Sequence, residues 1–389
     1  MSDTTRVMRI ITHLHISGPA LQAVLLTNRL NQLGYDGLLV AGKSLGEDDN
    51  MVDIAANYGV ETIELQHLDR TVNPLTAWRG FWQLYRLIKE KKPHIVHTHT
   101  TTAGFLGRLA ARMAGVPVVV HTMHVHPFRG YYNRFRTQVF IFVERWGAYL
   151  SDSIITLSEG LRKELSQTYH ITSRNRITVL PIGFDLQAFA DSKRHQGDFR
   201  QTWDILADAP LVGIIGRLLP VKNHSLFLQA AKHIHAQNPS IRFVIVGDGD
   251  DRLSLEQQSR AMGLSDVVTF TGWQRQMDAI YRDLDVLVIS SLNEGTPVPI
   301  IEALAANCPV VATDVGGIAE LLDGGKWGKL VPSGHVEALC RAILDTLEQP
   351  PDTREAQETM LRRYSIDRLA QDIDSLYRGL LAKKISAST

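Results

Sequence analysis

The sequence predicts an α/β protein made of two domains, each with its own parallel sheet. The chain has 389 residues, which is more than one ordinary α/β core needs. Short apolar runs alternate with amphipathic stretches, a pattern typical of consecutive βαβ units. This alternation fills the first half of the chain, stops in a polar stretch, and begins again near residue 211.

Thirteen apolar runs are predicted to be strands, with amphipathic helices between them. In the first half they lie at residues 7–12, 37–41, 62–65, 95–98, 116–121, 153–157 and 177–180. In the second half they lie at residues 211–216, 241–246, 267–271, 286–290, 310–313 and 328–331.

The same pattern predicts the domain boundaries. We expect an N-terminal Rossmann-like domain at residues 1–185 and a second at residues 206–365. Between them, residues 186–205 have weak periodicity and many polar residues, so a linker is predicted there. A final helical segment at 366–389 has no strand after it, and we expect it to cross back to the first domain.

Composition points to a cytoplasmic protein. The two cysteines, Cys308 and Cys340, are far apart and form neither a disulfide framework nor a zinc motif, and Cys308 is expected in the core. The chain has no apolar run of about 18 residues and no signal-peptide pattern at its start.

Ligands of open parallel sheets bind at the carboxyl ends of the strands, so loops that follow strands are the first candidates for a site. The loop after the first strand contains Ser17, Gly18 and Pro19, a tight turn that could hold a phosphate at Gly18. An ordinary βα turn explains this loop equally well. The loop lacks the glycine fingerprint of a dinucleotide site, which disfavours a dehydrogenase.

Three histidines lie at the end of the predicted strand at 116–121. His121 is its last residue, and His124 and His126 follow in the next loop. They lack the helical spacing of a zinc motif, and a histidine near a strand end is usually structural. A histidine here can also hydrogen-bond a sugar hydroxyl or stabilise positive charge that develops at a sugar carbon.

Two loops of the second half carry charges suited to a nucleotide sugar. Arg217 and Lys222 follow the strand at 211–216 and can converge on one diphosphate, although solvated side chains are the alternative. Glu294 and Glu302 flank a predicted helix start at which prolines leave backbone N–H groups free to bind an anion. Carboxylates on both sides of an anion site fit a ligand with a phosphate in the middle and hydroxyls at both ends. The nearby aspartates 248, 250 and 251 could suggest a metal site. A Gly-Asp-Gly turn at the end of a strand is the commoner explanation, so no metal site is predicted.

Residues 70–145 contain twelve Lys and Arg against two Glu, a net charge of +10, within a chain whose overall net charge is zero. Aromatic residues accompany this charge from residue 78 to residue 149. The aromatics could be core faces with a solvated basic rim. The alternative is that residues 70–149 meet an anionic membrane surface or a phosphorylated acceptor. No nucleic-acid-binding motif accompanies the charge, so nucleic acid is not expected as a partner.

Together these segments resemble the retaining glycosyltransferases of family 4, also called glycosyl transferases group 1. That family has the GT-B fold, two Rossmann-like domains whose parallel sheets face each other across a cleft. The resemblance spans nearly the whole chain and rests on the order and spacing of ISGPALQAVLLTNRLNQLGYD, PHIVHTHTTTAGFLGRLAARMAGVPVVVHTMH, IIGRLLPVKN, FVIVGDGDDR, VTFTGWQ, NEGTPVPIIEALAANCPVVATDVGGIAELL and GKLVPSG.

The resemblance implies roles for individual residues. His124 and Glu294 would be catalytic. The donor diphosphate would contact Gly18, Arg217, Lys222, Gly295, Thr296 and Pro297. The donor ribose and base would contact Glu302, Trp273 and Gln274. The chain departs from the family in having Ser17-Gly18-Pro19 where Gly-Gly is usual, and Asn307 where a small residue is usual.

The implied reaction is transfer of a hexose-type sugar from a nucleotide diphosphate sugar, expected to be a UDP-sugar, to an unidentified acceptor. The acceptor is expected to be lipid-linked or a polysaccharide, in envelope or exopolysaccharide synthesis at the inner face of the membrane. The resemblance implies retention of the anomeric configuration and no metal or other cofactor. Two alternatives stay open, a sugar-nucleotide epimerase of the same fold and a non-catalytic protein that binds sugar nucleotides.

Overall fold

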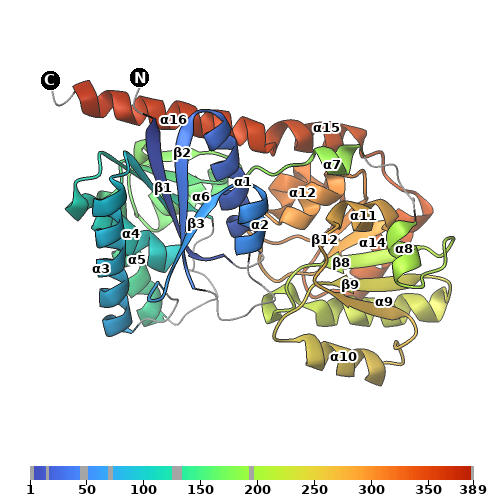
Figure 1. Cartoon of the computed structure of the whole chain (residues 1–389). Coiled ribbons are helices and arrows are strands. Elements are labelled where there is room, and N and C mark those ends of the chain that lie inside the picture. The colour runs from blue at the N-terminus through green and yellow to red at the C-terminus, as the bar shows by residue number, and fades with distance from the viewer. Residues whose placement is uncertain are drawn as a thin grey trace. The chain divides into compact units, whose positions relative to one another are not determined.

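The chain forms two compact units, each with a parallel sheet covered by helices (Figure 1). The computed structural model describes residues 4–14, 17–43, 51–68, 73–124, 134–191 and 197–386. The first unit comprises Met1–Asp185 and Tyr364–Thr389, and the second comprises Leu186–Arg363.

The sheet of the first unit has seven parallel strands in the order β3-β2-β1-β4-β5-β6-β7. They are β1 (Thr5–His13), β2 (Tyr35–Gly42), β3 (Glu61–Leu65), β4 (Ile95–His99), β5 (Val118–Met123), β6 (Ser153–Thr156) and β7 (Ile177–Val179). The strand order reverses between β1 and β4, and Val7 of β1 pairs with both Gly37 and Ile95. Loops after these two strands diverge, which opens the usual ligand position of such sheets.

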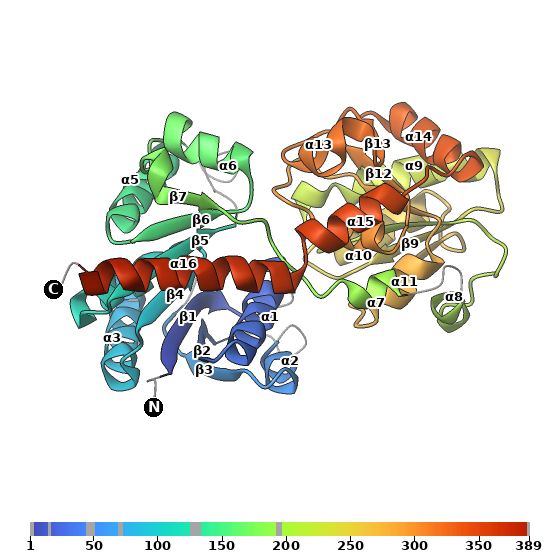
Figure 2. The ribbon, with the colours of Figure 1, turned by 90° about the horizontal axis from the view of Figure 1, so that it is seen from above.

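Helices cover both faces of this sheet (Figure 2). They are α1 (Gly18–Gln32), α2 (Val52–Asn57), α3 (Pro74–Lys91), α4 (Thr101–Ala114), α5 (Arg134–Tyr149), α6 (Glu159–Lys163) and α16 (Ile366–Ser386). Because neighbouring residues of a strand point to opposite faces, Ile10 packs in the core under α3 and α4 while Arg9 points toward α16. There Tyr377 of α16 accepts a hydrogen bond from Arg9 at 3.3 Å and pairs with His97 at 2.6 Å.

The sheet of the second unit has six parallel strands in the order β10-β9-β8-β11-β12-β13. They are β8 (Leu211–Ile215), β9 (Arg242–Val246), β10 (Val268–Gly272), β11 (Val286–Ile289), β12 (Val310–Thr313) and β13 (Lys329–Val331). The helices are α7 (Gln187–Ala190), α8 (Asp198–Thr202), α9 (His224–Gln237), α10 (Arg252–Ala261), α11 (Met277–Asp283), α12 (Val298–Ala305), α13 (Ile318–Leu321), α14 (Val336–Glu348) and α15 (Arg354–Arg363). The strand order of this second sheet reverses between β8 and β11. The loops after these two strands therefore lie where ligands of such sheets usually bind.

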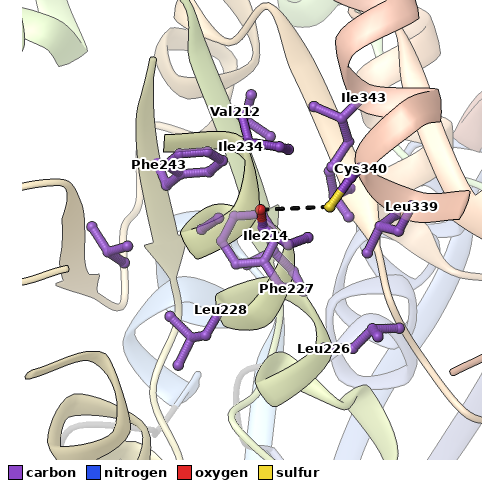
Figure 3. Close-up of a cluster of buried hydrophobic side chains, with 14 of the residues drawn as sticks. Val212, Ile214, Leu226, Phe227, Leu228, Ile234, Phe243, Leu339, Cys340 and Ile343 are labelled. Atoms are coloured by element: carbon purple, nitrogen blue, oxygen red, sulfur yellow. Dashed lines mark hydrogen bonds between the residues drawn. The ribbon is translucent and has the colours of Figure 1, made fainter. Parts of the chain in front are cut away.

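A buried apolar cluster fixes α9 and α14 on this sheet (Figure 3). Phe227 of α9 and Phe243 of β9 meet edge to face with ring centroids 5.9 Å apart. Ile343 packs from α14, and the Cys340 thiol lies 3.7 Å from the Ala230 carbonyl oxygen. Burying each such large apolar side chain stabilises the fold by about 1.5–3 kcal/mol. Cys308 is fully buried as well, which confirms its predicted place in the core.

All thirteen predicted strands are present, with ends within two residues of those predicted, and the last helix begins at Ile366 as predicted. No described helix is long and apolar enough to cross a membrane.

Residues 186–205, where the sequence predicts a linker, belong to the second unit and contain α7 and α8. The Asp283 carboxylate accepts hydrogen bonds from the backbone of Phe199 and Arg200, and the buried Arg200 guanidinium pairs with Asp285 at 2.9 Å. These anchors lie more than 80 residues further along the chain, so local sequence patterns could not predict them. Residues 192–196 lie outside the described part of the chain.

Candidate functional site

The loops after β8 and β11 are fastened to each other at the switch point of the second sheet. The Leu292 N–H donates to the Val221 carbonyl at 2.8 Å. The Ser290 hydroxyl lies 2.9 Å from the Lys222 carbonyl and 3.0 Å from the Asn223 carbonyl. Asn223 has a left-handed backbone, with φ of 51°, and α9 begins at the next residue. The two loops that carry most of the predicted site residues therefore form one connected structure.

Lys222 and Glu294, one from each loop, form an ion pair with 2.5 Å between Nζ and Oε1. The Ser291 hydroxyl donates to the same carboxylate oxygen at 2.7 Å. The Glu294 side chain is only 10% exposed, so the pair is partly removed from water and its geometry is restrained. The structure thus brings together two residues that the sequence predicts for the site.

Arg217 lies in the same loop as Lys222 but, unlike Lys222, forms no ion pair with a described carboxylate. Its side chain is half-buried, its Nε is buried without an acceptor, and no described carboxylate forms an ion pair with it. Removing an uncompensated cation from water is unfavourable, so an anion at this position would be bound favourably. Among the described residues Arg217 thus has no anionic partner, whereas Lys222 of the same loop is paired with Glu294.

The start of α12 offers backbone donors in the loop that holds Glu294. The helix begins at Val298 with Pro297 before it and Pro299 as its second residue, as the prolines predicted. Within the described chain, the N–H groups of Gly295, Thr296 and Val298 have no hydrogen-bond acceptor. Free N–H groups at a helix start favour negative charge, so an anion could be held there.

Two glycines after β12 allow the Glu294 loop to adopt its position, and sequence reasoning did not single them out. The Gly317 N–H donates to the Glu294 carbonyl at 3.1 Å. A Cβ at Gly316 would lie 1.8 Å from the Glu294 carbonyl oxygen, and one at Gly317 would lie 2.1 Å from the Gly295 oxygen. Gly316 also has a φ of +57°, so a side chain there would be strained even without the clash.

Glu302 differs from Glu294 in its surroundings. It is the fifth residue of α12, is 9% exposed, and accepts a hydrogen bond from the Tyr281 hydroxyl of α11 at 2.8 Å. Burial raises the pKa of Glu302 to about 7, although the Tyr281 hydrogen bond lowers it. The two carboxylates of the motif therefore have distinct environments, a loop ion pair and a buried acceptor whose charge changes near neutral pH. Tyr281 was not recognised from the sequence, because nothing local links it to Glu302.

Trp273 and Gln274 directly follow β10, at the same carboxyl edge of the second sheet, and both are half-buried. The Gln274 amide donates to the Thr271 carbonyl at 2.9 Å. On the neighbouring loop, Asp248 pairs with Arg252 at 2.7 Å and caps the Gly249 N–H. Among the described residues no group of three His, Cys, Asp or Glu side chains is placed to hold a metal ion.

The predicted site residues of the first unit, Gly18 and His124, lie in loops that follow β1 and β5, at the carboxyl edge of its sheet. Gly18 is the first residue of α1, after an extended Ser17. His15 and Ile16 of the same loop, and His126 of the histidine loop, lie outside the described residues. His124 directly follows β5 and is buried.

His124 belongs to a buried chain of aromatic groups that the sequence did not reveal. Its Nε2 lies 3.0 Å from Nδ1 of His99, and the His99 ring stacks on His97 with centroids 4.5 Å apart. His97 in turn bonds to Tyr377 at 2.6 Å and to Thr122 at 2.7 Å. Burial lowers the pKa of His124 to about 4, so its imidazole is neutral at pH 7. Its Nδ1 is buried and has no partner among the described residues, which leaves one ring nitrogen for a ligand.

Thr100, which follows β4 and precedes α4, has an unusual backbone with φ of 61° and ψ of 170°. Its hydroxyl lies 2.5 Å from the Thr12 hydroxyl at the end of β1. Strained residues of this kind concentrate at functional sites, and this one lies at the reversal of the strand order.

These features define a class of protein with two Rossmann-like domains, in which an arginine, a lysine and a helix start lie in two connected loops of the second. Comparison with known families agrees. Residues 16–188 match the family model described as Glycosyltransferase Family 4, and residues 196–363 match the one described as Glycosyl transferases group 1. The chain therefore belongs to glycosyltransferase family 4, as the resemblance predicted.

Individual relatives support this assignment. The chain is 29% identical over 324 residues to the UDP-Gal:α-D-GlcNAc-diphosphoundecaprenol α-1,3-galactosyltransferase of Escherichia coli, covering 82% of this chain and 83% of that protein. The structure is similar to Anabaena HepE in complex with UDP, with a TM-score of 0.79, 19% identity, and coverage of 96% of this chain and 100% of that one. It is also similar to a sucrose-phosphate synthase from Thermosynechococcus elongatus, with a TM-score of 0.83, 21% identity, and coverage of 97% and 100%. These likenesses show the GT-B fold.

Proposed function

We propose that this glycosyltransferase transfers a hexose-type sugar from a UDP-sugar to a lipid-linked or polysaccharide acceptor in cell-envelope or exopolysaccharide synthesis, with retention of the anomeric configuration. The observation that carries the donor part is Arg217, a half-buried cation without a described anionic partner, in the loop of the Lys222–Glu294 pair. A diphosphate would supply the missing negative charge.

The proposed roles follow from the surroundings of each residue. Arg217, Lys222 and the N–H groups of residues 295–298 would bind the diphosphate and stabilise it as it leaves, without a metal ion. Glu302 would accept hydrogen bonds from the ribose hydroxyls, and Trp273 and Gln274 would contact the base. His124, neutral because of burial, would hydrogen-bond a sugar hydroxyl through Nδ1.

Retention is proposed from membership of the family, and the surroundings of Glu294 favour a route without a covalent glycosyl–enzyme intermediate. Its Oε1 already receives Lys222 and Ser291, and these contacts reduce its ability to attack the sugar carbon as a nucleophile. The acceptor hydroxyl would then attack from the face that the diphosphate leaves, and a phosphate oxygen would take its proton.

The donor and acceptor classes are supported by the names of similar proteins. The E. coli relative is named for UDP-Gal as donor and a diphosphoundecaprenol-linked sugar as acceptor. Two further structures of HepE hold UDP with glucose and UDP-glucose. We extend to this chain the uracil nucleotide, a lipid-linked acceptor and a place at the inner face of the membrane, where residues 70–149 would meet anionic lipid.

Calorimetric titration with UDP, GDP and ADP in the presence of a chelator tests the donor site. We expect UDP to bind without metal, and we expect Arg217→Met to weaken binding by at least about tenfold, since a charge-assisted contact is worth roughly 1.5–3 kcal/mol. Arg260→Met is the matched control, because Arg260 is an exposed arginine on α10 of the same unit. Equal affinities for the two variants would contradict the assignment of Arg217. Tight UDP binding without sugar transfer to any acceptor, or with epimerisation of the sugar, would favour one of the two alternatives to a transferase.

A further inference from the structure

Helix α5 presents a continuous stripe of large apolar side chains on its outer face. The five side chains recur every three or four residues, which places them on one side of a helix. They are Phe135, Val139, Phe142, Trp146 and Tyr149, and all are exposed, the first and last by 78%. Isolated exposed apolar residues are common on soluble proteins, but a row of this length along one helix marks an interaction surface.

The opposite face of α5 is fixed to the first unit, so the helix cannot turn the stripe inward. Ile141 and Ala148 are buried in a cluster with β5 and β6. Glu144 is buried with Arg108 of α4 in an ion pair of 2.9 Å, and a Cβ at Gly147 would lie 2.3 Å from the Arg108 side chain. Rotation of α5 would leave this buried pair unpaired, which is strongly unfavourable.

Helix α3, which is separated from α5 by α4, also exposes large apolar side chains. Its first half exposes Leu75 by 71% and Trp78 by 60%. Helix α4 packs against both α3 and α5, and all three belong to the same run of parallel crossovers between β3 and β6. Their N-terminal ends therefore lie at the carboxyl edge of the sheet, where His124 also lies.

The exposed charges of α3 and α5 are nearly all positive. Arg79, Arg86 and Lys89 of α3 are exposed, and so are Arg134 and Arg145 of α5. The two helices contain two acidic residues. Glu90 of α3 is exposed, and Glu144 of α5 is buried in its pair with Arg108. Among the predicted basic and aromatic residues, Arg70, Arg129, Phe128, Tyr131 and Tyr132 lie outside the described residues.

We propose that the exposed face of α5, with Leu75 and Trp78 of α3, docks the protein on an anionic lipid bilayer. Aromatic side chains prefer the interfacial zone of a bilayer, and flanking arginines and lysines are attracted to anionic headgroups. The same combination disfavours a second copy of this chain, because two such basic surfaces would repel each other. This inference deepens the proposed function, since a lipid-linked acceptor is reached at the bilayer surface. The interpretation of these aromatics as core faces holds for Phe81, which is buried, but not for the α5 stripe.

Vesicle co-sedimentation of the full chain tests the proposal. Phosphatidylcholine vesicles and mixed phosphatidylcholine–phosphatidylglycerol vesicles are compared at low and high salt. We expect retention on the mixed vesicles that decreases with salt, and a decrease of about tenfold or more in the partition coefficient for Phe142→Gln/Trp146→Gln. The control is Leu206→Gln/Leu253→Gln, which removes two equally exposed apolar side chains from the second unit. Equal retention of the two double variants, or equal binding to both vesicle types, would overturn the proposal.

A site-directed probe locates the contact. Cys308 and Cys340 are buried, so a cysteine introduced by Phe142→Cys or Leu253→Cys is the accessible one to carry an environment-sensitive dye. We expect a blue shift on mixed vesicles for the label at position 142 and not at position 253. A concentration-dependent shift without lipid, together with dimers in light scattering, would instead show self-association and overturn the proposal.

Calorimetry with UDP on the same variants separates the two hypotheses. Vesicle binding without UDP binding would leave the docking surface standing and contradict the proposed function. UDP binding without vesicle retention would leave the donor site standing and contradict the docking surface.

Discussion

Replacing Tyr281 by phenylalanine should shift the pH at which the protein binds UDP well. The substitution removes only the hydroxyl that donates to Glu302 at 2.8 Å, inside a fully buried contact. That hydrogen bond lowers the pKa of Glu302, which burial has raised to about 7. A hydrogen bond to a charged group is worth about 1.5–3 kcal/mol, and one pKa unit corresponds to about 1.4 kcal/mol, so the pKa should rise by at least about one unit.

The expected change in affinity follows from the ionised fraction of Glu302. If ribose hydroxyls donate to the carboxylate, binding requires the ionised form. At pH 7 that fraction would fall from about one half to about one tenth, which weakens UDP binding about fivefold. At pH 9 both proteins would be almost fully ionised and the difference should nearly vanish.

Isothermal titration of both proteins with UDP at several pH values measures this effect. The ratio of the two dissociation constants at each pH cancels the titration of the phosphate itself. Tyr35→Phe is the matched control, because it removes a buried hydroxyl that donates to Asp374 at 2.7 Å in the first unit. A ratio that does not change with pH, or the same ratio for the control, would refute the role assigned to Glu302.

Three further outcomes are expected. Glu294→Gln should depress turnover strongly while changing UDP affinity little, and Glu302→Ala should mainly weaken UDP binding; equal, minor effects on kinetics and calorimetry would contradict both roles. Gly316→Ala should lower the urea midpoint more than Gly324→Ala, because both glycines have positive φ but only the first Cβ meets backbone, 1.8 Å from an oxygen. Acidification should destabilise the first unit: the pKa of His124 is about 4 when folded and about 6.5 when unfolded, so stability present above pH 6.5 is lost as pH falls toward 4, by up to about 3 kcal/mol from this group. Hydrogen exchange of α4 peptides at pH 7 and pH 5 measures this loss, and unchanged protection would contradict it.

The strands could be predicted because strands buried on both faces of a parallel sheet are continuous apolar runs. The partners of the site residues could not be predicted, since Tyr281 and Glu302, like His99 and His124, meet only through the tertiary fold. Helix α5 shows another limit of sequence reasoning. Both of its faces are rich in apolar residues, so periodicity alone could not tell which face is buried, and only the contacts of Ile141 with the core decide it.

The first unit is assembled from both ends of the chain, with the whole second unit as an insertion between residues 185 and 364. Tyr377 lies in the last helix, yet its hydroxyl bonds to Arg9 on the first strand and to His97 on the fourth. During synthesis the second unit is complete before the first unit has received this helix. We therefore expect the earliest part of the chain to be the last to reach its native state, with buried polar groups on β1 and β4 exposed until translation ends.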